Sequence, residues 1–260
     1  MAINWILESV DQSASTNEDL MARWRAGQLW EPIARKAITQ TSGKGRLGRA
    51  WVSHAKQALT FSVAHPFKKN ISELSGLSLA CGLAVIKGIS QASGISQADL
   101  RKQGLGLKWP NDIFLNDKKL AGLLLEGGQL DANQSTWIVI GIGINLTTDE
   151  ALANSIQRPI ASLDQISQIE SMDADVLWLA ILKELAEIIE LFEQHSFAKL
   201  QEEWNSWDIY KNQSCAIIQN EKIQLEGLER GVDDQGHLLI ESENKIQKVI
   251  SGDVSLKAKP

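Results

Sequence analysis

The hydrophobic positions of the chain follow two different spacings, and each spacing predicts its own type of element. Leu59 to Ala64 alternates between faces with a period of two, which predicts a strand. Trp5 to Leu7 and Ala34 to Thr41 are predicted as further strands. Trp137 to Leu146 is almost wholly apolar, which is typical of a buried strand.

Helical spacing dominates elsewhere. Apolar residues after Asp173 recur every three or four positions, and Asp173 can cap the helix that they predict. The stripe comprises Leu177, Ile181, Leu185, Ile188, Ile189 and Phe192. A second helix carrying Phe197 and Trp204 should follow. Earlier in the chain, a helix is expected from Ser72 to Gly94.

The first helix is predicted to begin at Ser15, because Ser15 and Glu18 have the spacing of a capping box. Leu20 and Trp24 would give it an apolar face, and Gly27 would end it. Locally, the polar residues Ser15, Thr16 and Asn17 need do no more than cap the helix. The free N–H groups at a helix start can also hold a polar ligand.

After about Tyr210 the pattern changes to short strands separated by polar turns. The predicted strands are Cys215 to Ile218, Lys222 to Leu228, Leu238 to Ile240 and Ile246 to Ile250. A unit of about 50 residues has little core of its own, so it should pack on the larger one. We therefore divide the chain into a domain at 1–208 and a small all-β domain at 209–260.

Composition limits the function classes. The 260 residues are 43% apolar and 22% charged, as in ordinary globular proteins. A net charge of −6 argues against general binding to nucleic acid or anionic membranes. Cys81 and Cys215 lie far apart, which suggests reduced thiols. No signal peptide or apolar run of roughly 20 residues is evident, so we expect a cytoplasmic protein without a membrane segment.

Thr39 to Trp51 interleaves glycines with positive charges. The glycines are Gly43, Gly45 and Gly48, and the cations are Lys44, Arg46 and Arg49. The spacing matches the dinucleotide fingerprint G-x-G-x-x-G, but the context does not. Extended chain is expected after it in place of a helix, and no acid lies about 20 residues on. We interpret the stretch as a basic loop for an anionic ligand. Taken alone, the same residues would also be compatible with a solvent-exposed charged turn.

Polar residues also stand at the ends of predicted strands. Asn111 and Asp112 should open one hairpin strand, and Lys119 should lie near the start of the next. The side-chain oxygens of Asn111 and Asp112 suit Mg²⁺, which usually accompanies nucleotide phosphates. Taken alone, Lys119 would be an ordinary surface residue of a turn. Gly143 removes a side chain from the apolar strand, and Asn145 stands at its end. The polar loop that follows, 147–158, has a length more typical of functional or mobile loops.

Four segments in this order resemble the biotin protein ligases: Ser15-Thr16-Asn17, the GKGRLGRAW loop, KWPNDI with KLAGLLLE, and GIGINL. The last stretch, with SGDVSLK near its end, resembles the SH3-like domain of that family. The resemblance covers almost the whole chain. It implies an α+β fold, in which a mixed-sheet catalytic domain of the biotin/lipoate ligase type carries a small C-terminal SH3-like β-barrel.

The resemblance also implies roles for individual residues. Lys119, Arg46 and Asp112 are expected to act in catalysis. The residues expected to bind biotin and ATP are Ser15, Thr16, Asn17, Gln40, Lys44, Gly45, Arg46, Arg49, Trp109, Asn111, Lys119, Gly143 and Asn145. None is expected to be a dedicated metal ligand. The family loop usually has an arginine where this chain has Lys44, and a lysine keeps the charge without the bidentate fork.

The implied reaction uses ATP, with Mg²⁺, to convert biotin to biotinyl-5′-AMP. The biotin then passes to a lysine in the biotin carboxyl carrier domain of acetyl-CoA carboxylase. Only a dozen or so residues precede Ser15, too few for a helix-turn-helix. We thus expect the monofunctional type, a monomer or homodimer without a nucleic-acid partner. The alternatives are a lipoate or octanoate ligase and a biotin-binding regulatory protein without catalysis.

Overall fold

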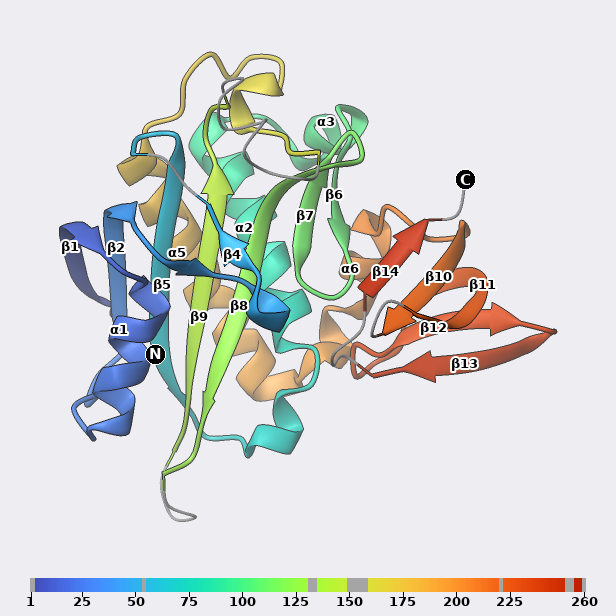
Figure 1. Ribbon diagram of the computed structural model, residues 1–260, viewed down its shortest axis with the longest axis horizontal. Coiled ribbons are helices and arrows are strands. Elements are labelled where there is room, and N and C mark those ends of the chain that lie inside the picture. Colours follow the sequence, from blue (N-terminus) through green and yellow to red (C-terminus); the bar gives the residue numbers. More distant parts are fainter. Residues whose placement is uncertain are drawn as a thin grey trace.

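The computed structural model describes residues 3–52, 55–130, 135–148, 159–219, 222–250 and 255–258. A seven-stranded sheet with helices on both faces forms the larger unit, and a five-stranded sheet beside it forms the smaller one (Figure 1). The predicted loop at 147–158 lies outside the described residues from 149 onward, as does the start of SGDVSLK at 251–254.

The large sheet is mixed, as expected. Its first two strands are parallel and all other neighbours are antiparallel. In spatial order the strands are β1 (Ile6–Ser13), β2 (Ile33–Gln40), β5 (Ala58–Phe67), β9 (Thr136–Asn145), β8 (Lys118–Gly128), β7 (Asp112–Leu115) and β6 (Leu105–Lys108). The predicted hairpin is confirmed as β7–β8, with Asp112 and Lys119 near the starts of its two strands.

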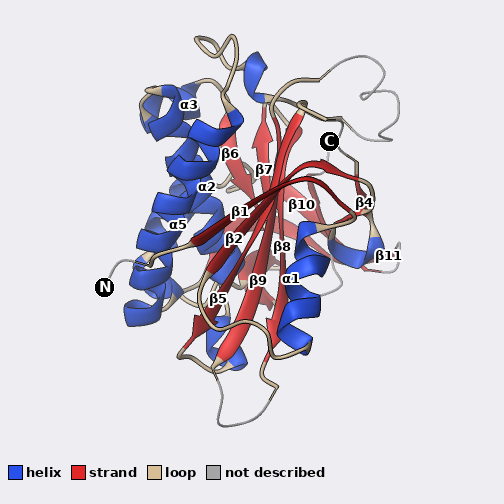
Figure 2. Cartoon of the chain, turned by 90° about the vertical axis from the view of Figure 1, so that its left-hand side faces the viewer, coloured by secondary structure: helices blue, strands red, loops and turns tan. Residues whose placement is uncertain are grey.

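Helices α2 (Leu77–Ser93) and α5 (Ala174–His195) cover one face, and α1 (Thr16–Arg25) lies on the other (Figure 2). Every residue of the predicted α5 stripe is buried, and Asp173 caps the helix through bonds to the N–H groups of Asp175 and Val176. The two long helices pack closely, since a Cβ on Gly88 would lie 2.5 Å from Ile181 Cγ1. The expected helix start at Ser72 is wrong, because a 3₁₀ turn at Ile71–Leu74 precedes α2.

The sequence interpretation missed two short elements of the large unit, α3 (Gln97–Lys102) and β6. The predicted helix at Phe197 is divided between a 3₁₀ turn, Phe197–Lys199, and α6 (Gln201–Trp207). A further 3₁₀ turn covers Leu163–Gln165. None of the helices in the described part of the chain is long and apolar enough to cross a membrane.

The small unit is an antiparallel sheet in the order β13 (Lys245–Val249), β12 (Leu238–Ser242), β11 (Lys222–Val232), β10 (Ser214–Gln219) and β14 (Ser255–Ala258). Its four predicted strands are confirmed, and β14 was not predicted. It packs on the large unit as expected: Trp109 donates from its indole to the carbonyl of Gly236 at 3.1 Å. The proposed division after residue 208 falls beyond the end of α6 and stays a prediction.

Candidate functional site

A cavity of about 460 Å³ opens between the start of α1, the glycine-rich loop, the β7–β8 hairpin and β14. All but one of the residues predicted to act in catalysis or binding line it. They are Ser15, Thr16, Asn17, Gln40, Lys44, Gly45, Arg46, Arg49, Trp109, Asn111, Asp112, Lys119 and Gly143. The exception is Asn145, whose amide donates to the carbonyls of Ala161 at 2.9 Å and Lys119 at 3.4 Å. Asn145 therefore supports the backbone of the site.

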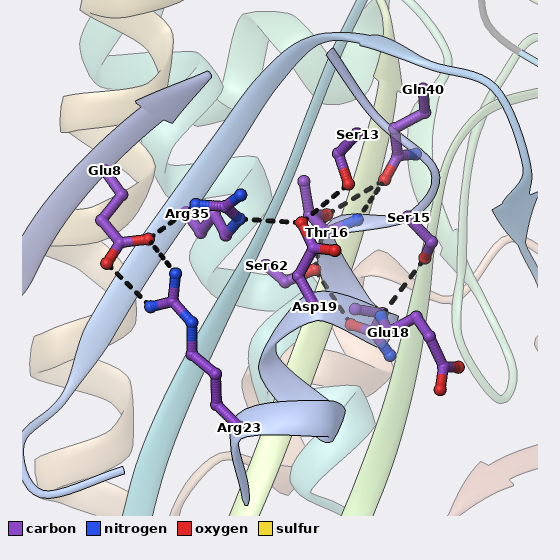
Figure 3. Close-up of polar contacts among 11 residues, drawn as sticks. Glu8, Ser13, Ser15, Thr16, Glu18, Asp19, Arg23, Arg35, Gln40 and Ser62 are labelled. Carbon is purple, nitrogen blue, oxygen red and sulfur yellow. Dashed lines mark hydrogen bonds and ion pairs between the residues drawn. The ribbon is translucent and has the colours of Figure 1, made fainter. Parts of the chain in front are cut away.

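The start of α1 forms one polar wall. Ser15 is the N-cap, and its hydroxyl accepts from the N–H of Glu18 at 3.4 Å. The backbone N–H of Thr16 donates to Gln40 Oε1 at 2.8 Å, and its hydroxyl lies 2.7 Å from Ser62 Oγ (Figure 3). Only half of the predicted capping box forms, because the carboxylate of Glu18 pairs with Arg25 and Lys44.

The glycine-rich loop is a small hairpin of β3 (Gly43–Lys44) and β4 (Ala50–Trp51), with a 3₁₀ turn at Arg46–Gly48. Gly43 is required because a Cβ there would lie 2.5 Å from the carbonyl oxygen of Trp51. Gly48 has a φ of 70°, which favours glycine. The loop leads into β4, as predicted, so its context differs from that of the dinucleotide fingerprint.

Each of three cations at the cavity has a polar partner. Lys119 forms an ion pair with Asp112, and only 12% of its side chain is exposed. Arg46 Nη1 donates to Asn111 Oδ1 at 3.2 Å, which ties the loop to the hairpin. Lys44 pairs with Glu18 at 2.6 Å with 51% of its side chain exposed, and the bond raises the pKa of Lys44. The residue that departs from the family pattern thus has a carboxylate partner on α1.

Sequence reasoning missed other lining residues, among them Trp51, Ser62, Lys108 and Lys257. The Trp51 indole covers Gly143, where a Cβ would lie 2.4 Å from Trp51 Cε2, so the glycine makes room for this ring. Lys119 Nζ is 5.9 Å from the same ring. Trp51 ends the GKGRLGRAW segment, so its position in the motif was a usable signal.

Lys108 and Lys257 add positive charge. Burial lowers the pKa of Lys108, whose ammonium lies 4.8 Å from the Phe114 ring and 5.4 Å from the Tyr210 ring. Lys257 comes from β14 of the small unit. Both stand inside quoted motifs, before WPND and at the end of SGDVSLK. Ser62 carried no local signal, because it lies on a strand that is remote from the motifs in sequence.

Comparison with known proteins identifies the family to which the chain belongs. The Biotin/lipoate A/B protein ligase family matches residues 10–145, and the Biotin protein ligase C terminal domain matches residues 211–257. The bifunctional ligase/repressor BirA of Escherichia coli is 34% identical over 249 residues, which cover 94% of this chain and 72% of BirA. The chain belongs to the biotin protein ligase family. The predicted resemblance is confirmed.

Other relatives agree with this family. The biotin–[acetyl-CoA-carboxylase] ligase of Mycobacterium tuberculosis is 30% identical, with 95% of this chain and 88% of that protein covered. The structure of the Aquifex aeolicus biotin protein ligase with biotin and ATP matches this ligase with a TM-score of 0.79 at 28% identity. That match covers 97% of this chain and 99% of the other. The predicted fold class is also confirmed, including the small C-terminal sheet.

The side chains at the cavity can be compared with the ligands that Mg²⁺ requires. Within the described residues, no group of three or more His, Cys, Asp or Glu side chains is placed to hold a metal ion. Mg²⁺ in nucleotide sites needs only one or two protein oxygens, because phosphates and water complete its shell. Asn111 and Asp112 supply such oxygens at the cavity wall. The residues therefore fit an ion that arrives with ATP.

Proposed function

We propose that this ligase activates biotin with ATP to form biotinyl-5′-AMP and then transfers biotin to a lysine in the biotin carboxyl carrier domain of acetyl-CoA carboxylase. The observation that carries the proposal is the pairing of two walls in one cavity. The neutral polar residues at the start of α1 and the cations of the loop and hairpin line the same cavity. A ligand with a polar ring and a carboxylate tail suits such a cavity.

The cations account for the first step. The biotin carboxylate must approach the α-phosphate of ATP, and the repulsion between two anions raises the barrier. Arg46, Arg49 and Lys119 line the space in which they would meet. Fixed positive charge lowers the energy of the transition state most when it does not have to reorganise. Lys119 is held in this way by its ion pair with Asp112.

The second step needs a base and a dry site. The ε-amine of the acceptor lysine would attack the mixed anhydride, expel AMP and release a proton, and we propose Asp112 as the acceptor of that proton. The reaction proceeds without an enzyme nucleophile. The loop would keep water from hydrolysing the intermediate, since the Arg46–Asn111 bond holds it against the hairpin.

We propose that Asn111 and Asp112 would hold Mg²⁺ together with the phosphates of ATP. When bound, the ion would neutralise part of the charge on those phosphates. Lys257 reaches the cavity from the C-terminal unit, so we propose that this unit takes part in nucleotide binding.

The decisive experiment incubates the protein with biotin, Mg-ATP and a biotin carboxyl carrier domain and measures the mass of the carrier. A gain of one biotin supports the proposal, and an unchanged carrier contradicts the second step. ATP–pyrophosphate exchange with biotin or lipoate as the acid separates the first alternative. A regulatory protein that only binds biotin would give no exchange with either acid.

A further inference from the structure

A row of hydrogen-bonded side chains connects the start of α1 with β5 and β8 and ends on a carboxylate. Ser62 Oγ lies 2.7 Å from Thr16 Oγ1 and 3.0 Å from Asn17 Oδ1. Asn17 Nδ2 lies 2.6 Å from Oε2 of Glu126, which is on β8. Figure 3 shows Thr16 and Ser62 of this row, with Gln40 bonded to Thr16. Thr16, Ser62 and Asn17 are buried and line the cavity, whereas Glu126 is absent from the described lining residues.

The carboxylate of Glu126 decides which way each hydrogen points. An ionised carboxylate can only accept hydrogen bonds, so it must face the NH₂ group of Asn17. The oxygen of Asn17 is then turned toward Ser62, which must give it its one hydroxyl proton. Ser62 can in consequence only accept from Thr16. The Thr16 hydroxyl has two acceptors in reach, Ser62 Oγ at 2.7 Å and Gln40 Oε1 at 3.1 Å, and the shorter contact directs its proton along the row toward Ser62.

The same order reaches the other end of the row. Gln40 Oε1 accepts from the backbone N–H of Thr16 at 2.8 Å, so its NH₂ group is free to face the other way. Three groups are then left for a ligand in the cavity that these residues line: the NH₂ group of Gln40, the second N–H of Asn17, which Glu126 does not take, and a hydroxyl lone pair of Thr16. Reversal of the Asn17 amide would exchange a donor for an acceptor at the ligand.

The Asn17 amide has little room to move. A Cβ on Gly141 would lie 2.4 Å from Asn17 Oδ1, so the amide packs directly on the bare backbone of β9. Asn17 itself is 4% exposed. With its position fixed by packing, the remaining freedom of the amide is its orientation, and Glu126 sets that.

We propose that Glu126 is a positioning residue for biotin binding, which fixes the polarity of the row Thr16–Ser62–Asn17 and so the pattern of donors and acceptors at the cavity. The cyclic urea of biotin carries two N–H donors and one acceptor oxygen, and it needs its complement in one fixed order. The inference rests on the biotin binding proposed above.

The test measures biotin affinity by calorimetry, and KM for biotin, KM for ATP and kcat by pyrophosphate release. Glu126→Ala should raise the Kd and KM for biotin about ten-fold, or ~1.4 kcal/mol. Its kcat and its KM for ATP should stay within about two-fold of the parent. Glu126→Gln should show a smaller rise, since an amide can present either polarity to Asn17. The matched control is Glu31→Ala, which removes an exposed carboxylate from the loop after α1.

A double-mutant cycle separates positioning from packing. In an Asn17→Ala background, Glu126→Ala should change biotin affinity by less than about two-fold, because the amide that it orients is gone. An unchanged biotin KM in both Glu126 variants would overturn the inference, as would a full effect without Asn17. If Glu126→Ala does not fold, the isosteric Glu126→Gln carries the test. A parent chain that binds no biotin would overturn the proposed function as well, so the two failures are distinguishable.

Discussion

At the scale of single residues, the cations of the cavity differ in how firmly they are held. Lys119 and Asp112 are paired with 12% and 21% of their side chains exposed, whereas Lys44 and Glu18 are paired with 51% and 40% exposed. An exposed pair contributes little, since water and salt screen it. A largely buried pair keeps its geometry, and removal of one partner leaves the other desolvated and unpaired. Lys119 is therefore the cation most closely fixed to the hairpin.

Lys119→Ala should slow adenylation by about 10²–10³, as for loss of one preorganised donor at a developing charge. The variant also leaves the carboxylate of Asp112 without its partner. Biotin-dependent release of pyrophosphate measures the effect. Lys118→Ala is the matched control, because Lys118 is the exposed neighbour on the same strand and should retain the parental rate within about two-fold. Near-parental release by Lys119→Ala would contradict the assignment.

The residues of the cavity that could be predicted lie in short motifs whose spacing is local. Lys44, Gly45 and Arg46 sit in one loop, and Asn111 and Asp112 begin one strand. Ser62 could not be found in this way, because it lies on β5, outside the motifs. Glu126 ends the KLAGLLLE segment, but its contact with Asn17 depends on the register of β5, β9 and β8 beside α1, which no local pattern gives.

At the scale of elements, the helix that carries the polar wall is tied to the sheet by charge. Glu8 on β1 accepts two bonds from Arg23 of α1, at 2.8 and 3.0 Å, and one from Arg35 of β2 at 2.8 Å (Figure 3). Arg35 also donates to Asp19 of α1 at 2.9 Å. These contacts fix α1 against β1 and β2, and so position its first turn at the cavity.

Arg35→Ala should lower the free energy of unfolding by about 1.5–3 kcal/mol, because two carboxylates lose a charged donor. Arg25→Ala, whose pair with Glu18 is largely exposed, should cost at most ~1 kcal/mol. Urea unfolding at pH 7 gives both values.

The hydrogen bond from Arg23 lowers the pKa of Glu8 below its ordinary value. The network thus stabilises the fold above that ordinary pKa, and its contribution is lost as the pH falls through the lowered one. If Arg35→Ala and Arg25→Ala lower the free energy of unfolding equally, the network contributes no more to stability than an exposed ion pair.

Elements with a long, regular pattern were predictable, and short ones were not. α5 and β9 contain enough apolar positions for their periods to be read directly. α3 has six residues with Leu100 as its buried apolar anchor, and β14 has four. Such segments take their structure from their neighbours: β14 is extended because it pairs with β10. The start of α2 was misplaced because Ser72 belongs to a separate turn with its own cap at Asn70.

At the scale of the whole molecule, the two units share a junction that bears on the site. The N–H of Ile209 donates to the carbonyl of Leu107 at 3.0 Å, on strand β6, which leads to Trp109. The small unit also places Leu256 and Lys257 at the cavity. Displacement of this unit would therefore change the wall of the cavity, and the stability of the junction becomes a condition for activity.

Two carboxyl groups, Asp208 and Glu229, lie at that junction. Glu229 is fully buried, and its Oε1 accepts from the N–H of Gly231. Asp208 Oδ1 accepts from the N–H of Tyr210 at 3.0 Å. The second oxygens, Glu229 Oε2 and Asp208 Oδ2, lack a hydrogen-bond partner among the described residues. Burial, together with the nearby charge of Asp208, raises the pKa of Glu229 to about 8.

The sign of the resulting pH dependence follows from linkage. A carboxyl group with a raised pKa in the folded state stabilises the fold fully below its ordinary pKa, and the contribution is lost as the pH rises through the raised value. Because of Glu229, the free energy of unfolding of the parent should therefore fall as the pH rises from 6 to 9. Glu229→Gln removes this titration while keeping a group that can donate to Asp208. The variant should show a flatter curve of unfolding free energy against pH, and greater stability than the parent at pH 9.

Urea unfolding at pH 6, 7, 8 and 9 measures both curves, with Glu243→Gln as a control in the exposed turn between β12 and β13. The control should run parallel to the parent. Adenylation measured at pH 9 should be better retained in Glu229→Gln than in the parent, because an intact junction keeps Lys257 at the cavity. Parallel curves for all three proteins would mean that Glu229 does not titrate in this range, and the junction would then have no part in the alkaline loss of stability.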